Sequence, residues 1–117
     1  MRFYVSNLIE DMDRLLKTLP IEYKNALLSG SVFEVDFKDE DKHWYSPFIL
    51  WTKEEVENYQ PDSEFSSYLA IGSNGGGETY LLSLIDGSIS VCDLISGKGS
   101  LENVASNYSE LLAQLNN

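Results

Sequence analysis

The chain has 117 residues and a mass of 13.2 kDa, which is the size of one compact domain. Hydrophobic residues make up 43% and charged residues 23%, a composition typical of folded proteins that excludes intrinsic disorder. Nineteen acidic against eight basic residues give a net charge of −11, which argues against direct binding to nucleic acid and to anionic membranes.

The chain also lacks the usual signals for export or membrane insertion. No stretch approaches the ~18 apolar residues of a transmembrane helix, and residues 1–7 lack the apolar core of a signal peptide. Cys92 is the only cysteine, so no internal disulfide can form. We therefore expect a single domain over residues 1–117, located in the cytoplasm.

Two helices are predicted first in chain order. The first is amphipathic, with Ser6 as its N-cap and an apolar stripe formed by Leu8, Met12, Leu15, Leu16 and Leu19. Pro20 ends this helix and suits the first turn of a second one over residues 21–29. Gly30 then provides a left-handed stop.

Strands and a capped helix are predicted next. Alternation over residues 33–37 indicates a strand with one buried face. Residues 38–47 are polar and charged and predict an exposed loop, and the apolar run 48–51 predicts a buried strand. Thr52 and Glu55 have the spacing of a capping box, which predicts a helix that ends before Pro61. Residues 68–71 predict a further strand, followed by a glycine-rich turn over residues 72–77.

The last part of the chain predicts a hairpin and a helix. Asp86-Gly87 between two apolar runs indicates a two-residue type I′ turn, which would pair Leu84 with Ile89 and Leu82 with Val91 in a sheet with one covered face. Ser100 is the predicted N-cap of a second long amphipathic helix, with apolar positions from Leu101 to Leu115. Together these elements predict an α+β fold: an antiparallel sheet with helices packed on one side and amphipathic helices at both ends.

No motif indicates catalysis or a cofactor. The glycine run has the spacing of a phosphate-binding loop, but Glu78 stands where the lysine should be and would repel phosphate. The acidic run beside His43 lacks the spacing of a calcium loop. No serine or cysteine lies in a nucleophile motif, whereas pairing of carboxylates is a three-dimensional question that the sequence leaves open. We expect a non-enzyme without metal or cofactor.

Acidity is concentrated in the middle of the chain. Residues 34–64 hold ten of the nineteen acidic residues and three lysines. One interpretation is a solvated surface that keeps the protein soluble, and the other is a face that attracts a basic partner. Trp44 and Tyr45 lie among polar neighbours, where they are either core residues or partner anchors. The candidate partner-binding residues are Asp36, Asp39, Glu40, Asp41, Trp44, Tyr45, Glu54, Glu55 and Glu57.

Two stretches resemble signatures of the SUKH superfamily. Leu19-Pro20-Ile21-Glu22-Tyr23-Lys24-Asn25-Ala26-Leu27-Leu28 is similar to the helix "L-P-x-[DE]-Y-[KR]-x-[FA]-L", and Ile71-Gly72-Ser73-Asn74-Gly75-Gly76-Gly77-Glu78-Thr79-Tyr80 is similar to the second signature. The predicted order of elements extends the resemblance over essentially the whole chain. The family usually has an Asn-Gly-Gly-like turn after the short helix, and Ser29-Gly30-Ser31 departs from it.

The resemblance implies an α+β fold without an active site. Bacterial members typically bind and block the toxin domains of polymorphic or contact-dependent systems, many of them nucleases, whereas other members are intracellular regulatory and scaffold proteins. The family has no shared catalytic residues to transfer. We therefore expect an immunity protein whose partner is a basic toxin domain, with an intracellular regulatory or adaptor module as the alternative.

Overall fold

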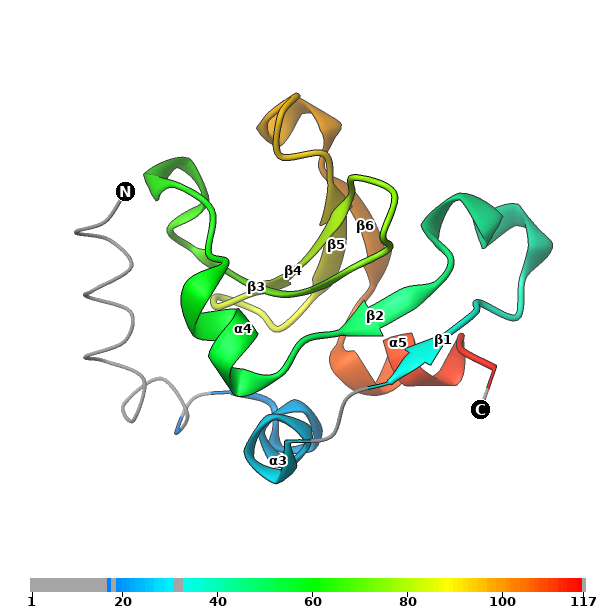
Figure 1. Cartoon of the computed structure of the whole chain (residues 1–117), viewed down its shortest axis with the longest axis horizontal. Coiled ribbons are helices and arrows are strands. Elements are labelled where there is room, and N and C mark those ends of the chain that lie inside the picture. Colours follow the sequence, from blue (N-terminus) through cyan, green and yellow to red (C-terminus); the bar gives the residue numbers. More distant parts are fainter. Residues whose placement is uncertain (1–16, 18, 31–32, 117) are drawn as a thin grey trace.

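The fold is built on a curled antiparallel sheet of six strands, seen in a computed structural model that describes residues 17, 19–30 and 33–116 (Figure 1). The strands are β1 (Glu34–Val35), β2 (Phe48–Leu50), β3 (Tyr68–Ser73), β4 (Thr79–Ser83), β5 (Ile89–Cys92) and β6 (Glu102–Ala105). Each strand pairs with the strand before and after it in sequence, so the sheet is a simple meander. This architecture confirms the predicted α+β fold class.

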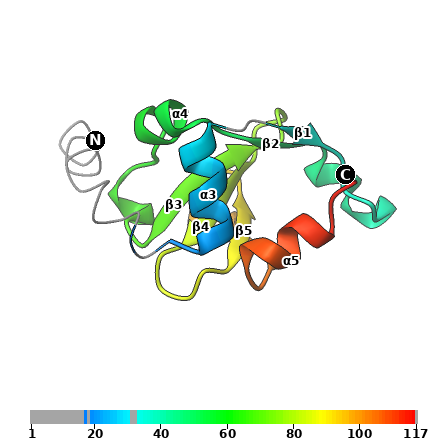
Figure 2. The same cartoon turned by 90° about the horizontal axis from the view of Figure 1, so that it is seen from below.

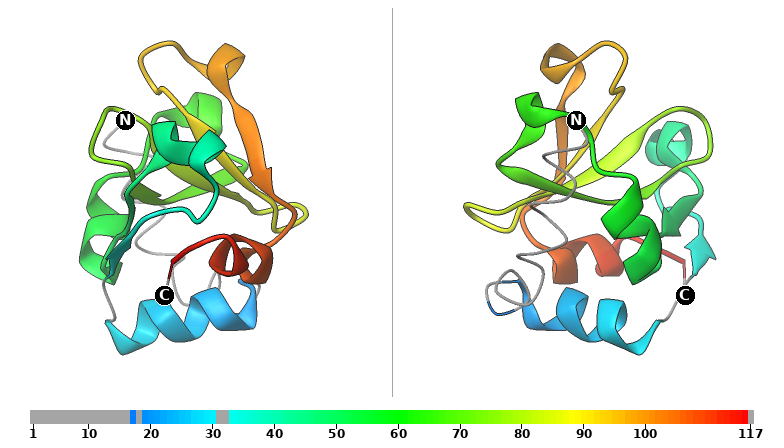
Figure 3. Two further views of the ribbon diagram at one scale, coloured as in Figure 1. Left: turned by 90° about the vertical axis from the view of Figure 1, so that its right-hand side faces the viewer. Right: turned by 60° about the vertical axis from the view of Figure 1, so that its left-hand side comes forward.

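Among the described residues, three α-helices and three short 3₁₀ helices accompany the sheet. The α-helices are α3 (Ile21–Ser29), α4 (Lys53–Asn58) and α5 (Tyr108–Ala113), and the 3₁₀ helices are η1 (Glu40–Tyr45), η2 (Ser63–Phe65) and η3 (Lys98–Ser100). α3 and α5 lie together on one side of the sheet, below it in Figure 3 and in front of it in Figure 2. Their contact includes the edge-to-face rings of Tyr23 and Tyr108, with centroids 5.3 Å apart.

Apolar side chains cover both faces of the central strands. The main core packs one face, with Tyr80, Leu82, Ile89 and Val91, against the helices. A smaller cluster covers the other face and consists of Phe65, Ala70, Leu81 and Cys92. The prediction of one covered face was therefore wrong, because η2 and the segments after β2 and β5 fold over the second face.

The helices with clear end signals agree with their predictions. α3 spans the predicted residues and ends at Gly30, whose φ of 72° is left-handed. Pro20 occupies its N-cap position instead of its first turn. At α4 the capping box is complete: the Glu55 amide donates to Thr52 Oγ1 at 3.1 Å, and the Thr52 amide donates to Glu55 Oε1 at 2.9 Å. The predicted first helix lies outside the described residues.

The segment between α3 and β2 is less regular than predicted. The strand expected over residues 33–37 is reduced to Glu34–Val35, and Phe37 instead forms an isolated bridge with Leu115. The expected loop over residues 38–47 contains η1, with a kink at Lys42. Thus this segment is tied to the end of the chain as well as to the sheet.

The β4–β5 hairpin has a different turn from the predicted one. Leu82 pairs with Ile89 and Tyr80 with Val91, a slip of two residues that keeps the same side chains on the same face. A type I′ turn requires positive φ at both central residues. In the described chain only glycines have positive φ, so Gly87 qualifies and Asp86 does not. The loop is accordingly four residues long, and the Ser83 amide donates to Ser88 O across its base.

The predicted long C-terminal helix is also wrong in its first half. Residues 102–105 form β6 and pair with β5, which buries Val104 and Ala105. The helix begins only after Asn107, whose side chain accepts a hydrogen bond from the Glu110 amide at 2.8 Å. The predicted N-cap, Ser100, instead bonds the backbone of Asp93.

Candidate functional site

Most of the predicted partner-binding residues lie on the segment around η1. Asp36, Asp39, Glu40 and Asp41 are exposed, and the Trp44 side chain is 71% exposed. We call these five residues the η1 surface. They extend from the end of β1 through η1, so one short stretch of chain positions all of them.

An open hollow marks one side of the η1 surface. Its volume is about 420 Å³, and its lining includes three of the predicted acidic residues, one lysine and an asparagine: Asp36, Asp39, Glu40, Lys38 and Asn116. The Asn116 amide donates to Asp36 O at 2.8 Å, which holds the segment after α5 against the segment after β1. The hollow is therefore a concave, predominantly acidic part of the surface.

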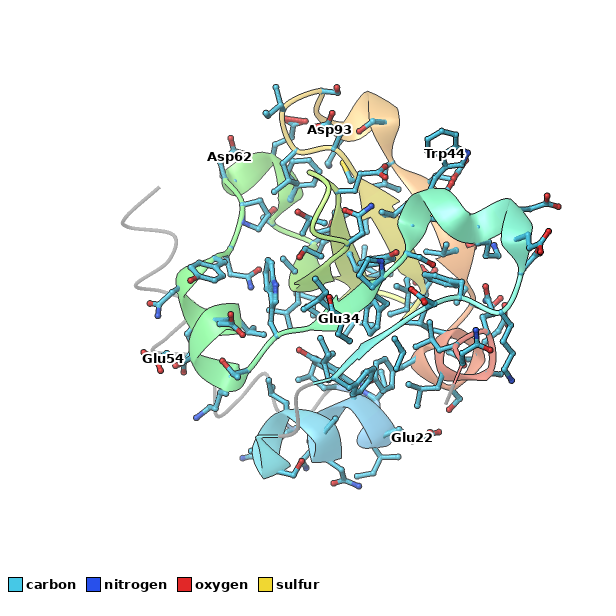
Figure 4. All side chains as sticks on the ribbon, turned by 45° about the vertical axis from the view of Figure 1, so that its right-hand side comes forward. Glu22, Glu34, Trp44, Glu54, Asp62 and Asp93 are labelled. Atoms are coloured by element: carbon cyan, nitrogen blue, oxygen red, sulfur yellow. The ribbon has the colours of Figure 1, made fainter. Side chains whose placement is uncertain are left out.

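The three predicted residues on α4 do not join the η1 surface. η1 precedes β2 and α4 follows it, so the strand separates them, and Glu54 and Trp44 lie on opposite sides of Figure 4. Glu55 is used in the capping box, and Glu57 lies 4.0 Å from Lys53. The predicted residues on α4 therefore lie apart from the η1 surface.

Tyr45 differs from its neighbour Trp44 in its surroundings. Its ring is half-buried, with its centroid 6.3 Å from that of Phe37, and it packs against the main core. Of the two predicted anchors, Trp44 is therefore the more exposed one. An exposed tryptophan is the residue type most enriched among binding hot spots.

Two buried polar side chains hold the backbone beneath Trp44. Asn74 Nδ2 donates to Trp44 O at 3.0 Å, and the Tyr80 hydroxyl donates to Tyr45 O at 2.6 Å. Asn74 is 6% exposed and Tyr80 is fully buried. Burial, with a smaller contribution from the Glu78 carboxylate, raises the pKa of the Tyr80 phenol, so this hydroxyl remains a donor at physiological pH.

Asn74 also organises the glycine-rich turn. Its Oδ1 accepts hydrogen bonds from the Gly76 and Glu78 amides, and its Nδ2 donates to Glu78 Oε1 at 3.3 Å. The turn that resembles a phosphate-binding loop is thus closed on itself. Neither Asn74 nor Tyr80 was predicted as a site residue, although both lie in the second stretch that resembles the SUKH signature.

We also searched the described part of the chain for a metal site, a reactive cysteine and a membrane-spanning helix. No three His, Cys, Asp or Glu side chains come together there as a group that could hold a metal ion. Cys92 is buried, with its sulfur 3.4 Å from both Gly97 O and Ser100 Oγ. None of the helices described there is long and apolar enough to cross a membrane. Neither a comparison with protein-family models nor a search of curated proteins finds a match.

Proposed function

We propose that this chain is a non-catalytic immunity protein that acts in the cytoplasm. It binds a basic toxin domain, a nuclease, and neutralises it stoichiometrically through the η1 surface. The resemblance to the SUKH superfamily motivates the class of function. The observation that supports the choice of surface is the exposed Trp44 indole on a segment rich in carboxylates. The backbone carbonyls of Trp44 and Tyr45 accept hydrogen bonds from Asn74 and Tyr80.

The charges of the η1 surface suit a nuclease as the partner. A nuclease needs cationic side chains in its cleft to hold phosphates, and carboxylates can occupy the same cleft. Opposite charges also accelerate encounter, up to ~10⁸–10⁹ M⁻¹s⁻¹ at low salt. Arginine fits both kinds of group on this surface, because a guanidinium pairs with carboxylates and stacks on indole rings.

The test begins with the toxin. If the adjacent upstream reading frame encodes a protein with a toxic C-terminal domain, co-expression of this chain should rescue cells from that domain. The purified toxin domain should form a one-to-one complex with this chain. Loss of viability despite co-expression, together with no complex, would contradict the proposal.

Charge reversal then tests the surface. We predict that D39K/E40K/D41K slows association with the toxin domain at least tenfold at low salt and flattens its salt dependence, because local attraction is lost. Each reversal adds two charge units, so the formal net charge of −11 becomes −5. Stability should hold, since exposed substitutions usually cost under ~0.5 kcal/mol each.

A matched control separates local from overall charge. E54K/E102K/E110K makes the same change in net charge at three exposed positions on α4, β6 and α5. It should bind the toxin domain much faster than the η1 triple variant. Equal slowing by the two triple variants, or an unchanged rate in D39K/E40K/D41K, would show that the η1 surface is only a solvated acidic surface.

A further inference from the structure

The η1 segment is a short helical element whose geometry is interrupted by a kink. It is a 3₁₀ helix of six residues with a kink at Lys42, where φ is −103°. At its start, the Lys42 amide donates to Asp39 O and the Asp41 amide donates to Asp39 Oδ1. Short 3₁₀ segments are marginal without tertiary support, so the orientation of Trp44 depends on contacts from elsewhere in the fold.

Those contacts come from β4 and from the turn that precedes it. Asn74 Nδ2 and the Tyr80 hydroxyl bond two consecutive carbonyls, those of Trp44 and Tyr45, at the end of η1. Both donors are buried, so loss of either removes a fixed hydrogen-bond partner from one of these carbonyls. Two adjacent ties restrict rotation of this backbone far more than one would.

The side chain of Asn74 is used to its full capacity. An asparagine side chain offers two donor hydrogens and one carbonyl oxygen with two lone pairs. Here the oxygen accepts from Gly76 and Glu78, and the nitrogen donates to Glu78 and Trp44. The same residue therefore shapes its own turn and binds η1.

We infer that Asn74 and Tyr80 are positioning residues of the η1 surface. By holding the Trp44 and Tyr45 carbonyls, they present the exposed indole in one orientation to an arginine-bearing partner. Pre-organisation of this kind lowers the ordering cost that binding otherwise incurs. The inference rests on the proposed function for the partner, whereas the positioning itself can be measured on the free protein.

Tyr80→Phe is the first test, with Tyr108→Phe as its matched control. Both changes remove one buried hydroxyl and keep the ring, but the Tyr108 hydroxyl has no hydrogen-bond partner among the described residues. In a Trp51→Phe background, Trp44 is the only tryptophan, so its fluorescence anisotropy reports its mobility. Tyr80→Phe should lower this anisotropy, and Tyr108→Phe should leave it unchanged.

A charge-neutral double variant tests Asn74. In N74D/E78Q the aspartate still accepts from the two turn amides and the new glutamine can donate to it, but no donor remains for Trp44 O. We expect about fivefold faster exchange of the Lys42 and Phe37 amides, which donate to Asp39 O and Ser46 Oγ, with unchanged exchange in β4. Two results would overturn the positioning role: an equal increase in amide exchange throughout the protein, or no increase in exchange at the Lys42 and Phe37 amides.

Binding to the toxin domain separates this inference from the proposed function. Tyr80→Phe and N74D/E78Q should raise the dissociation rate about fivefold, and Trp44→Ala should raise it more. A looser η1 with an unchanged dissociation rate in both variants would overturn the positioning role in binding. An unchanged rate in Trp44→Ala would instead overturn the proposed surface, while the anisotropy result would still stand for the free protein.

Discussion

Replacement of Gly72 by alanine should destabilise the protein strongly. Gly72 pairs with Leu50 across β2 and β3, and a Cβ at this position would lie 2.3 Å from Ile49 O and 3.4 Å from Phe48 Cε1. The nearest atom is backbone, so no side-chain rotation can relieve the clash and β2 must move away by roughly 1 Å. Overpacking typically costs 1–3 kcal/mol, and we expect about 3 kcal/mol here. In a protein of this size, that corresponds to a fall in melting temperature of roughly 10–15 °C.

Urea unfolding followed by circular dichroism measures this loss, with Gly99→Ala as the control. A Cβ at Gly99 would meet no atom within 4 Å, and its φ is not positive. Gly99→Ala should therefore stay within about 0.5 kcal/mol of the unmodified protein. A Gly72→Ala protein that is equally stable would refute the reasoning, because it would show that β2 and β3 do not approach as closely as described.

Two further predictions concern alkaline pH and the start of α4. Burial raises the folded-state pKa of Tyr23, Tyr80 and Tyr108, the last to about 12, so their stabilisation is complete below pH 10 and is lost as pH rises through the folded-state values. Urea unfolding at pH 9, 10 and 11 should show a decline of up to ~1.4 kcal/mol per pH unit per tyrosine. Thr52→Ala should cost about 1 kcal/mol in the same assay, because it removes the N-cap oxygen that Glu55 N uses, and Thr52→Ser should restore most of it. A free energy of unfolding that stays constant between pH 9 and 11 would contradict the tyrosine assignment. A Thr52→Ala protein as stable as the unmodified one would contradict the N-cap assignment.

Local signals in the sequence predicted the elements whose ends depend on neighbouring residues. Gly30 stops α3 because its left-handed conformation is available to glycine at no steric cost, and Thr52 starts α4 through a bond that spans three residues. Both signals act within one turn of helix. They can be read without knowledge of the rest of the fold.

The errors fall where a distant segment decides the structure. Val104 and Ala105 fit a helical stripe, but pairing with β5 places them in a strand, which periodicity over a few residues cannot distinguish. The turn after β4 depends on whether Asp86 adopts positive φ, and it does not. Here the Leu84 amide bonds Ser67 O instead, a partner outside the hairpin.

The sequence predicted the charge of the candidate site but not which of its residues lie close together in space. The distribution of charge along the sequence located the acidic segment. Trp44 was predicted to be either a core residue or an exposed anchor, and the structure shows it exposed. The exclusion of α4 follows from the position of β2 between two acidic runs, which is a matter of topology. The roles of Asn74 and Tyr80 could not be foreseen, because each binds a carbonyl far away along the chain.

The hydrogen bonds that support η1 affect the order in which parts of the fold can form during synthesis. A meander can pair each strand with the previous one as the chain emerges, because neighbouring strands are adjacent in sequence. The η1 segment is different: it is supported by Asn74, by Tyr80 and finally by Gln114, whose carbonyl accepts from the Lys38 amide at 2.8 Å. A nascent chain halted before residue 114 would therefore contain the six strands described above but an incompletely supported η1 surface. The η1 surface would gain its full support only once Gln114 has packed against Lys38.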